Sequence, residues 1–230
     1  MLQCNCHVLG DAETLEAVVV DPGDEVARIE EILARHKLKV RAIVSTHAHI
    51  DHVGGLARLA QSTGAPVMMH AADLPLYDNL AIQAAFLGMP APPATKIDQL
   101  VREGDSIRWG HFAANIFHTP GHSPGSITLY LPAENTGVED AAKTSGQHEA
   151  HTAHDAVETV TDADVPRLFA GDTLFAGSIG RTDLWGGSSR QILDSIREKL
   201  LVLPDRTLVL PGHGPATTIG EERESNPFLR

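Results

Sequence analysis

The chain contains little cysteine, few aromatic residues and no long apolar run. Of its 230 residues only Cys4 and Cys6 are cysteines, and 4% are aromatic. Two cysteines so close in sequence cannot form a useful structural bridge, so we expect a fold that does not depend on disulfides. The pair could act in redox chemistry or bind a soft metal, but we favour partly buried strand residues, because free cysteine packs as a small hydrophobe.

The lack of long apolar runs argues against a membrane protein. No run approaches the roughly 20 residues needed to cross a bilayer. The first residues, Met1 to Cys6, lack the basic start and the apolar stretch of a signal peptide. We therefore expect a cytoplasmic protein with no membrane partner. A hydrophobic content of 42% in 230 residues is enough for a substantial core.

Positive charge is scarce as well. The formal net charge is -12, which argues against a nucleic-acid partner because phosphate binding needs a basic surface. Eight acidic residues and a single lysine lie between Ala133 and Asp164, so this segment carries -7 of that charge. We expect it to be a solvated, mobile insert between two strands. Its histidines His148, His151 and His154 could form an accessory metal site, but we favour an exposed loop.

The most informative segment follows the largely apolar run Val40 to Val44. It reads Thr46-His47-Ala48-His49-Ile50-Asp51-His52-Val53-Gly54-Gly55. Imidazole nitrogen and carboxylate oxygen are ligands that borderline divalent ions such as Zn(II) prefer. Alternating positions on an extended loop project His47 and His49 the same way, whereas Asp51 and His52 fall where a helix begins and point elsewhere. One loop can therefore supply two neighbouring metal positions.

Hydrophobic periodicity predicts strands and helices in alternation, followed by hairpins and a second α/β stretch. The expected strands are Ala17–Val20, Val40–Ser45, Val67–His70, Ser106–Trp109, Ala113–His118, Ser126–Leu131, Arg167–Ala170 and, last, Thr207–Leu210. The expected helices are Asp24–His36, a segment from about Gly54 to Gln61, and Ser188–Leu201. Leu87 to Thr95, which is rich in proline, is expected to be irregular. Two strand-rich parts, each flanked by helices, predict an α/β body of four layers, helix, sheet, sheet, helix.

Three further strand ends carry a possible metal ligand directly after or beside a glycine. These ligands are His122, Asp172 and His213. A chain that leaves a strand to aim one side chain at an ion needs a tight turn and a close backbone approach, which glycine allows. A single such turn would be weak evidence, but four ligand-bearing loops in one chain indicate a metal site.

The ordered set His47-x-His49-x-Asp51-His52, His122, Asp172 and His213 resembles the metallo-β-lactamase superfamily. The resemblance covers nearly the whole chain except the acidic segment, so it implies one αββα sandwich domain over residues 1–230 with an insert at about 133–164. It also implies two divalent metal ions, Zn(II) first, with Fe or Mn as alternatives. By resemblance, His47, His49 and His122 hold the first ion, Asp51, His52 and His213 hold the second, and Asp172 bridges them.

Within the superfamily, the run Gly171 to Asp183 most resembles glyoxalase II, the hydroxyacylglutathione hydrolases, in their compact bacterial form. The closing run Pro211 to Gly220 points the same way. The resemblance implies hydrolysis of a small-molecule thioester such as S-lactoylglutathione. Two features of long-form glyoxalase II are not found: its C-terminal helical domain, and a lysine followed by an aromatic residue, in place of which this chain has Arg181-Thr182-Asp183.

The implied reaction gives several residues a role. Two cations would lower the pKa of a shared water toward about 7 and polarise the thioester carbonyl, while Asp51 orients the attacking hydroxide. Arg181 could bind a substrate carboxylate through its planar fork, or could form only a loop salt bridge with Asp183. Asp21 could orient a ligand histidine or merely cap a turn. The sequence leaves both pairs of alternatives open.

Two competing functions remain. Persulfide dioxygenases share the Gly-Arg-Thr-Asp segment and use a single non-haem iron held by the counterparts of His47, His122 and Asp172. A non-enzymatic, metal-stabilised binding protein is less favoured, because structural zinc sites are closed and usually rich in cysteine. We interpret the other histidines outside the insert as surface or strand residues, and the tryptophans as packing residues, although Trp185 could line the cleft. These residues are His7, His36, His70, His111, His118, Trp109 and Trp185.

Overall fold

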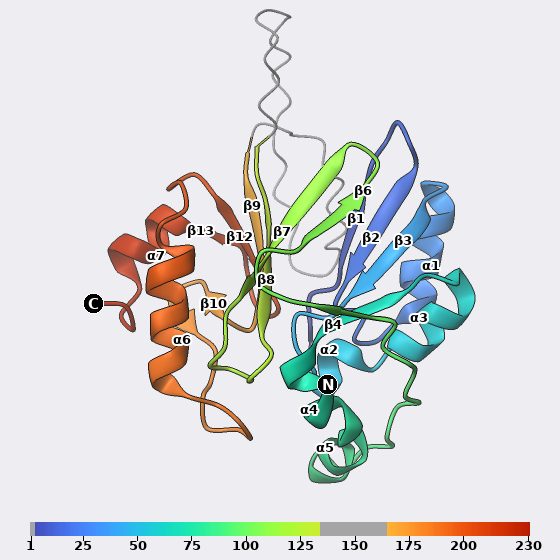
Figure 1. Cartoon of the computed structure of the whole chain (residues 1–230), viewed down its shortest axis with the longest axis horizontal. Coiled ribbons are helices and arrows are strands. Elements are labelled where there is room, and N and C mark those ends of the chain that lie inside the picture. Colours follow the sequence, from blue (N-terminus) through green and yellow to red (C-terminus); the bar gives the residue numbers. More distant parts are fainter. Residues whose placement is uncertain (1–2, 134–164) are drawn as a thin grey trace, which may run out of the picture.

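Two mixed β-sheets form the centre of the molecule, with helices on their outer sides (Figure 1). The computed structural model describes residues 3–133 and 165–230. The expectation for an insert at 133–164 therefore falls almost wholly outside the described residues, and the extent of the domain stays a prediction. The predicted four-layer order of helix, sheet, sheet, helix is confirmed.

The first sheet has the strand order β1-β2-β3-β4-β5, in which only the β1–β2 pair is antiparallel. Its strands are β1 (His7–Gly10), β2 (Glu16–Val20), β3 (Lys39–Val44), β4 (Val67–His70) and β5 (Gln99–Val101). The helical segments of this half are α1 (Val26–Arg35), α2 (Ile50–Val53), α3 (Leu56–Thr63), η1 (Ala71–Asp73), α4 (Leu74–Asp78) and α5 (Leu80–Phe86). Helices α1 and α3 lie along the outer face of the sheet.

The second sheet has the order β13-β12-β9-β8-β7-β6, with β9 and β12 parallel and the other pairs antiparallel. Its strands are β6 (Ser106–Trp109), β7 (Phe112–His118), β8 (Ile127–Leu131), β9 (Arg167–Gly171), β12 (Leu208–Pro211) and β13 (Thr217–Thr218). A small hairpin is made by β10 (Leu174–Phe175) and β11 (Ser178–Ile179), and the helical segments are α6 (Ser189–Ser195), η2 (Ile196–Leu200) and α7 (Ile219–Ser225).

Alternation along the strands produces three apolar layers. In β2, Val19 packs toward α1 and α3, whereas Val18 and Val20 pack between the two sheets. In β9, Phe169 joins the layer between the sheets and its neighbour Leu168 faces α6. Because successive strand residues point to opposite faces, each sheet buries one face against its partner and the other against helices.

The predicted strands and helices are present with shifts of one or two residues, and Leu87 to Thr95 is irregular as expected. Three expectations were wrong. Cys4 and Cys6 are partly buried but precede β1 and belong to no strand. The strand at Thr207–Leu210 is not the last, since β13 follows it. Trp109 is buried as a packing residue, but Trp185 is 59% exposed.

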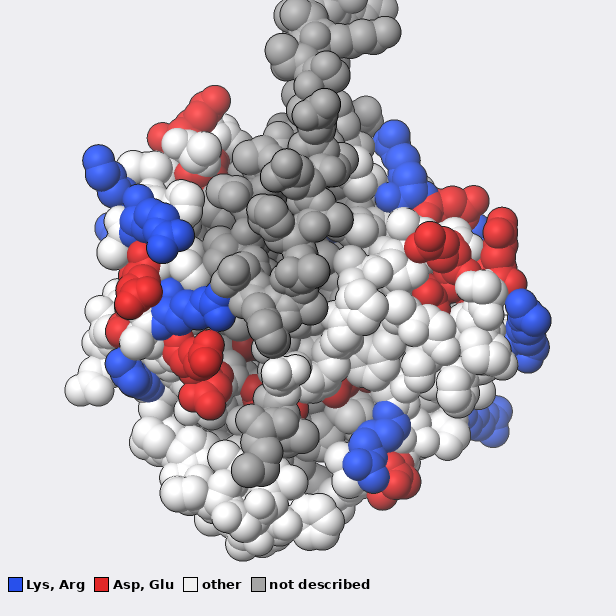
Figure 2. Space-filling view, turned by 180° about the vertical axis from the view of Figure 1, so that it is seen from behind, with Lys and Arg blue, Asp and Glu red and all other residues white. Residues whose placement is uncertain are grey.

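Charged side chains of both signs lie next to one another around the face seen in Figure 2, and its described part shows no continuous basic surface. Over residues 3–133 and 165–230, no helix is both long and apolar enough to span a bilayer.

Candidate metal centre

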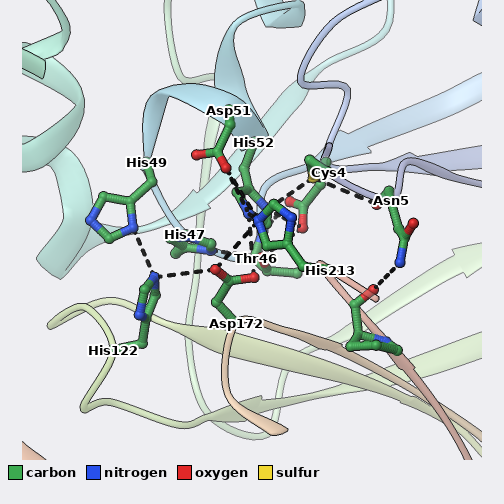
Figure 3. Close-up of polar contacts among 12 residues, drawn as sticks. Cys4, Asn5, Thr46, His47, His49, Asp51, His52, His122, Asp172 and His213 are labelled. Atoms are coloured by element: carbon green, nitrogen blue, oxygen red, sulfur yellow. Dashed lines mark hydrogen bonds and ion pairs between the residues drawn. The ribbon is translucent and has the colours of Figure 1, made fainter. Parts of the chain in front are cut away.

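The structure brings all seven predicted ligands together where loops from both sheets meet (Figure 3). His47 and His49 follow β3, and Asp51 and His52 lie in α2. The second sheet supplies the rest: His122 from the β7–β8 loop, Asp172 after β9, and His213 after β12. Residues separated by as many as 166 positions therefore share one site.

His47, His49 and His122 form the first group, with their ligand atoms within 4.8 Å of one another. His49 Nδ1 lies 2.8 Å from His122 Nε2. The Nε2 atom of His47 is buried and has no hydrogen-bond partner among the described residues. A buried nitrogen left without a partner costs free energy, so three converging imidazoles of this kind fit a cation at their centre.

Asp51, His52 and His213 form the second group. His213 Nε2 lies 3.2 Å from Asp51 Oδ2 and 3.3 Å from His52 Nε2. The His52 side chain is fully buried, whereas that of His213 is 30% exposed. The second group is therefore the more accessible to solvent, as expected for a site that admits a small molecule.

Asp172 lies between the two groups. Its Oδ2 atom is 3.5 Å from His122 Nε2 and 3.6 Å from His213 Nε2, and its Oδ1 atom is 3.4 Å from His52 Nε2. Oδ1 is buried and accepts no hydrogen bond from the described residues. One carboxylate that faces both groups with an unsatisfied oxygen is suited to join two cations.

Three histidines of the centre have a hydrogen-bond partner on the ring nitrogen that faces away from the other ligands. Asp21 Oδ2 accepts from His52 Nδ1 at 3.0 Å, the Arg181 carbonyl accepts from His122 Nδ1 at 2.8 Å, and the Gln3 carbonyl accepts from His213 Nδ1 at 2.7 Å. Such bonds fix the tautomer and orientation of each ring. Of the two alternatives for Asp21, the structure favours contact with a ligand histidine.

Burial and neighbouring charges lower the pKa of His47 and His49 and raise that of His52. Burial, together with the surrounding imidazoles, holds the pKa of His47 well below its ordinary value and lowers that of His49 to about 4. Burial also lowers the pKa of His52, but Cys4, Asp21 and Asp172 outweigh it and raise the value well above normal. Neutral imidazole is the form that binds metal, so the first group is ready to bind at neutral pH.

Glycine permits the close approach of the strand-end loops. A Cβ atom on Gly212 would lie 2.3 Å from Asp172 Oδ1 and 2.6 Å from His52 Cε1. Both contacts are far too short for any larger residue, and the carboxylate that bridges the groups would have to move. The glycine beside His213 is therefore required by packing, as the sequence pattern indicated.

Sequence reasoning missed the contribution of the residues before β1. Besides the Gln3 carbonyl, Asn5 Nδ2 donates to the carbonyls of Pro211 and Gly214, and Cys4 Sγ lies 3.4 Å from His52 Nδ1. No local pattern marks these residues, because their partners are up to 210 positions away. The side chain of Arg181, the other open case, forms two bonds of 2.7 and 2.8 Å with Asp183.

Comparison with known proteins identifies related chains. The family model for the metallo-beta-lactamase superfamily matches residues 1–138 and 134–213. An uncharacterized protein of Mycobacterium tuberculosis is 39% identical and covers 100% of this chain and 94% of its own length. The hydroxyacylglutathione hydrolase GloC of Haemophilus influenzae is 34% identical, with 99% and 93% covered. The mitochondrial persulfide dioxygenase ETHE1 of Mus musculus is 29% identical, with 97% and 70% covered.

Solved structures of other proteins also match this chain over most of its length. The B3 metallo-beta-lactamase BLEG-1 matches with a TM-score of 0.78 at 37% identity, covering 96% of this chain and 92% of its own. TTHA1623 in a di-iron-bound form matches with a TM-score of 0.75 at 35% identity, covering 99% and 96%. A dinuclear centre fits the donor set described above, and TTHA1623 holds iron in the form matched here.

Proposed function

The chain belongs to the metallo-β-lactamase superfamily, and we propose that it is a metal-dependent hydrolase that cleaves a small-molecule thioester such as S-lactoylglutathione. The observation that carries this proposal is the placement of Asp172 between two groups of nitrogen and oxygen donors. The similarity to GloC over nearly both whole chains supports the thioester class. Seven such donors around two cations leave room for water, unlike a closed, cysteine-rich structural site.

Each residue of the centre has a role under this proposal. His47, His49 and His122 would hold one cation, Asp51, His52 and His213 would hold the other, and Asp172 would serve both groups. Zn(II) suits this donor set, while the di-iron form of TTHA1623 makes iron an alternative, and Mn is a further one. When bound, two such cations lower the pKa of water and polarise a carbonyl oxygen.

Asp51 and Arg181 are the residues proposed to act on the reactants. Burial raises the pKa of Asp51, but His213 and His52 outweigh it and lower the pKa to about 2. Asp51 is therefore a carboxylate at neutral pH, and it can orient a water molecule by accepting a hydrogen bond from it. The Arg181 fork is exposed and now pairs with Asp183. A substrate carboxylate has the same bidentate geometry as the Asp183 side chain, so it would replace Asp183 on the Arg181 guanidinium.

Persulfide dioxygenase activity is the second candidate, supported by the 29% identity with mouse ETHE1. Under that alternative a single iron is held by His47, His122 and Asp172, and the Asp51, His52 and His213 group holds none. The two candidates therefore differ in metal number as well as in reaction.

Metal analysis combined with two assays separates the candidates. We expect about two divalent ions per chain, hydrolysis of S-lactoylglutathione, and no oxygen consumption with glutathione persulfide. One iron per chain with persulfide-dependent oxygen uptake would overturn the hydrolase. The His213→Ala variant is the matched control, because it removes a proposed ligand of the second ion only and should abolish hydrolysis while one ion remains bound.

A further inference from the structure

Asp73, at the end of η1, is a fully buried carboxylate that belongs to neither donor group. It accepts three hydrogen bonds. Its Oδ2 atom accepts from the Ala48 amide at 2.9 Å and from the Ser123 hydroxyl at 2.8 Å, and its Oδ1 atom accepts from the Gly125 amide at 2.6 Å. A buried carboxylate is costly to desolvate, and these donors are what offsets that cost.

The three donors come from two different ligand loops. Ala48 stands between His47 and His49 in the loop after β3, whereas Ser123 and Gly125 follow His122 in the β7–β8 loop. Asp73 itself comes from a third segment, directly after β4. Its two oxygens therefore join the loop that carries two imidazoles of the first group to the loop that carries the third.

We propose that Asp73 is a positioning residue that sets the spacing of the three imidazoles of the first metal group. This inference rests on the proposed function, in which His47, His49 and His122 hold one cation. The approach of His49 Nδ1 to within 2.8 Å of His122 Nε2 depends on how the two loops are held. Asp73 anchors both loops through the backbone or side chain next to each histidine.

Close packing brings the β7–β8 loop against the Asp73 carboxylate. A Cβ atom on Gly125 would lie 2.6 Å from the Asp73 amide nitrogen and 2.7 Å from its Oδ1 atom, so the loop can approach the carboxylate only with glycine there. Gln83 of α5 also bonds Ala48 and Ile50, but of the two ligand loops it bonds only the loop after β3. Among the described residues, Asp73 is the side chain seen to bond both loops at once.

The Asp73→Asn variant tests the proposal, because its amide must face at least one of the three donors. We expect a folded protein whose metal content falls from about two ions to about one. Its affinity for the first ion should weaken by about tenfold or more, the scale seen when a partner behind a metal ligand is removed. Co(II) substitution adds a second measurement, since the visible spectrum of cobalt held by the three histidines should change in position and intensity.

Asp11 supplies a matched control. It too is a buried carboxylate that joins two segments. It lies in the β1–β2 turn, where it accepts from the amides of Glu13 and Thr14, and it also accepts from the His111 amide in the β6–β7 turn. Asp11→Asn should therefore destabilise the fold without changing metal content. Equal metal loss in both variants would mean a general effect of stability and would overturn the proposal.

Two further outcomes are decisive. If Asp73→Asn does not fold, the Ser123→Ala variant replaces it, because this change removes one donor and leaves the Asp73 carboxylate bonded to two amides. Weaker binding of the first ion by Ser123→Ala supports the proposal. Wild-type affinity overturns it. Two ions bound normally by Asp73→Asn would overturn this inference alone. A wild-type protein that binds no divalent ion would overturn the proposed function together with it.

Discussion

At the scale of the residue, three imidazoles of the site have two nitrogens with different environments. One nitrogen of His52 faces His213 and Asp172, and the other bonds Asp21 at 3.0 Å. His122 and His213 are arranged the same way, with backbone carbonyls behind them. A ligand histidine can therefore be recognised by the acceptor bonded to its outward-facing ring nitrogen as well as by the groups near its other nitrogen.

Replacing His52 by alanine should remove one of the two cations. His52 lies in the group with Asp51 and His213, while His47, His49 and His122 remain in place. We expect about one metal ion per chain by elemental analysis and an unchanged circular dichroism spectrum. His36→Ala, at an exposed position after α1, is the control and should retain two. Unchanged stoichiometry in the His52 variant would refute the assignment.

Protonation of Asp11 should make the protein less stable at low pH. Burial raises the pKa of this carboxyl, but hydrogen bonds from His111, Thr14 and Glu13 outweigh it and hold the pKa well below the ordinary value of 3.8. Because the folded-state pKa is depressed, the contribution to stability is complete above about pH 4 and is lost as the pH falls further.

Urea unfolding of metal-free protein measures this effect. Wild type should exceed Asp11→Asn in free energy of unfolding at pH 7, and the difference should shrink below about pH 4 as the carboxyl binds a proton. Asp183→Asn is the control: Asp183 lies exposed on a loop, where solvent screens its charge, so this variant should differ little from wild type in free energy of unfolding at either pH. A pH-independent difference for the Asp11 variant would contradict the prediction.

At the scale of the element, the sequence predicted β3, β9 and β12, which precede ligands, because each contains successive buried apolar residues. Such a run, as in β3, can be found in the sequence without knowing which strands pair with it. The short elements were not predicted: β10, β11 and β13 have two residues each and depend on contacts with distant segments. Helix α7 was not predicted either, although a capping box formed by Thr218 and Glu221 marks its start.

The candidate site was easier to predict than the fold around it. Ligand atoms demand particular side chains, so the histidine and aspartate positions stand out in the sequence, and the structure brings all seven together. Their supports do not stand out, because a carbonyl such as that of Gln3 or Arg181 can belong to any residue. The anchoring role of Asp73 also depends on contacts 25 to 52 positions away, which no local pattern reveals.

Helix α5 should stabilise the ligand loop through Gln83. Its side chain accepts from the Ile50 amide at 3.0 Å and donates to the carbonyls of Ala48 and Leu76 at 3.1 and 3.0 Å. Gln83→Ala leaves these groups without that partner, and we expect a loss of about 1–3 kcal/mol in the free energy of unfolding by urea titration. Gln61→Ala, at an exposed position in α3, should cost much less. Equal costs would contradict the role given to Gln83.

At the scale of the whole molecule, the segment from 133 to 164 connects two strands that already pair. Leu131 at the end of β8 is the register partner of Arg167 at the start of β9. A short turn can join such ends, and closing a shorter loop costs less entropy. None of the seven proposed ligands lies between 133 and 164.

Deleting Ala133 to Asp164 and joining β8 to β9 by a short hairpin turn should therefore leave metal content and thioester turnover largely unchanged. Elemental analysis and steady-state kinetics beside the full chain would check this. Loss of metal or of turnover in a well-folded deletion variant would show that the segment takes part in the function.

The meeting of residues 3–5 with the loop after β12 sets when the centre can be assembled during synthesis. The histidine loop after β3 leaves the ribosome early, yet the carbonyl of Gln3 cannot orient His213 until some 165 more residues have been added. At about 5–20 residues per second, that interval lasts roughly ten to thirty seconds. Throughout it the second proposed group lacks His213, although the first group is complete once His122 has been added, so the two groups can form one centre only after His213 has been synthesised.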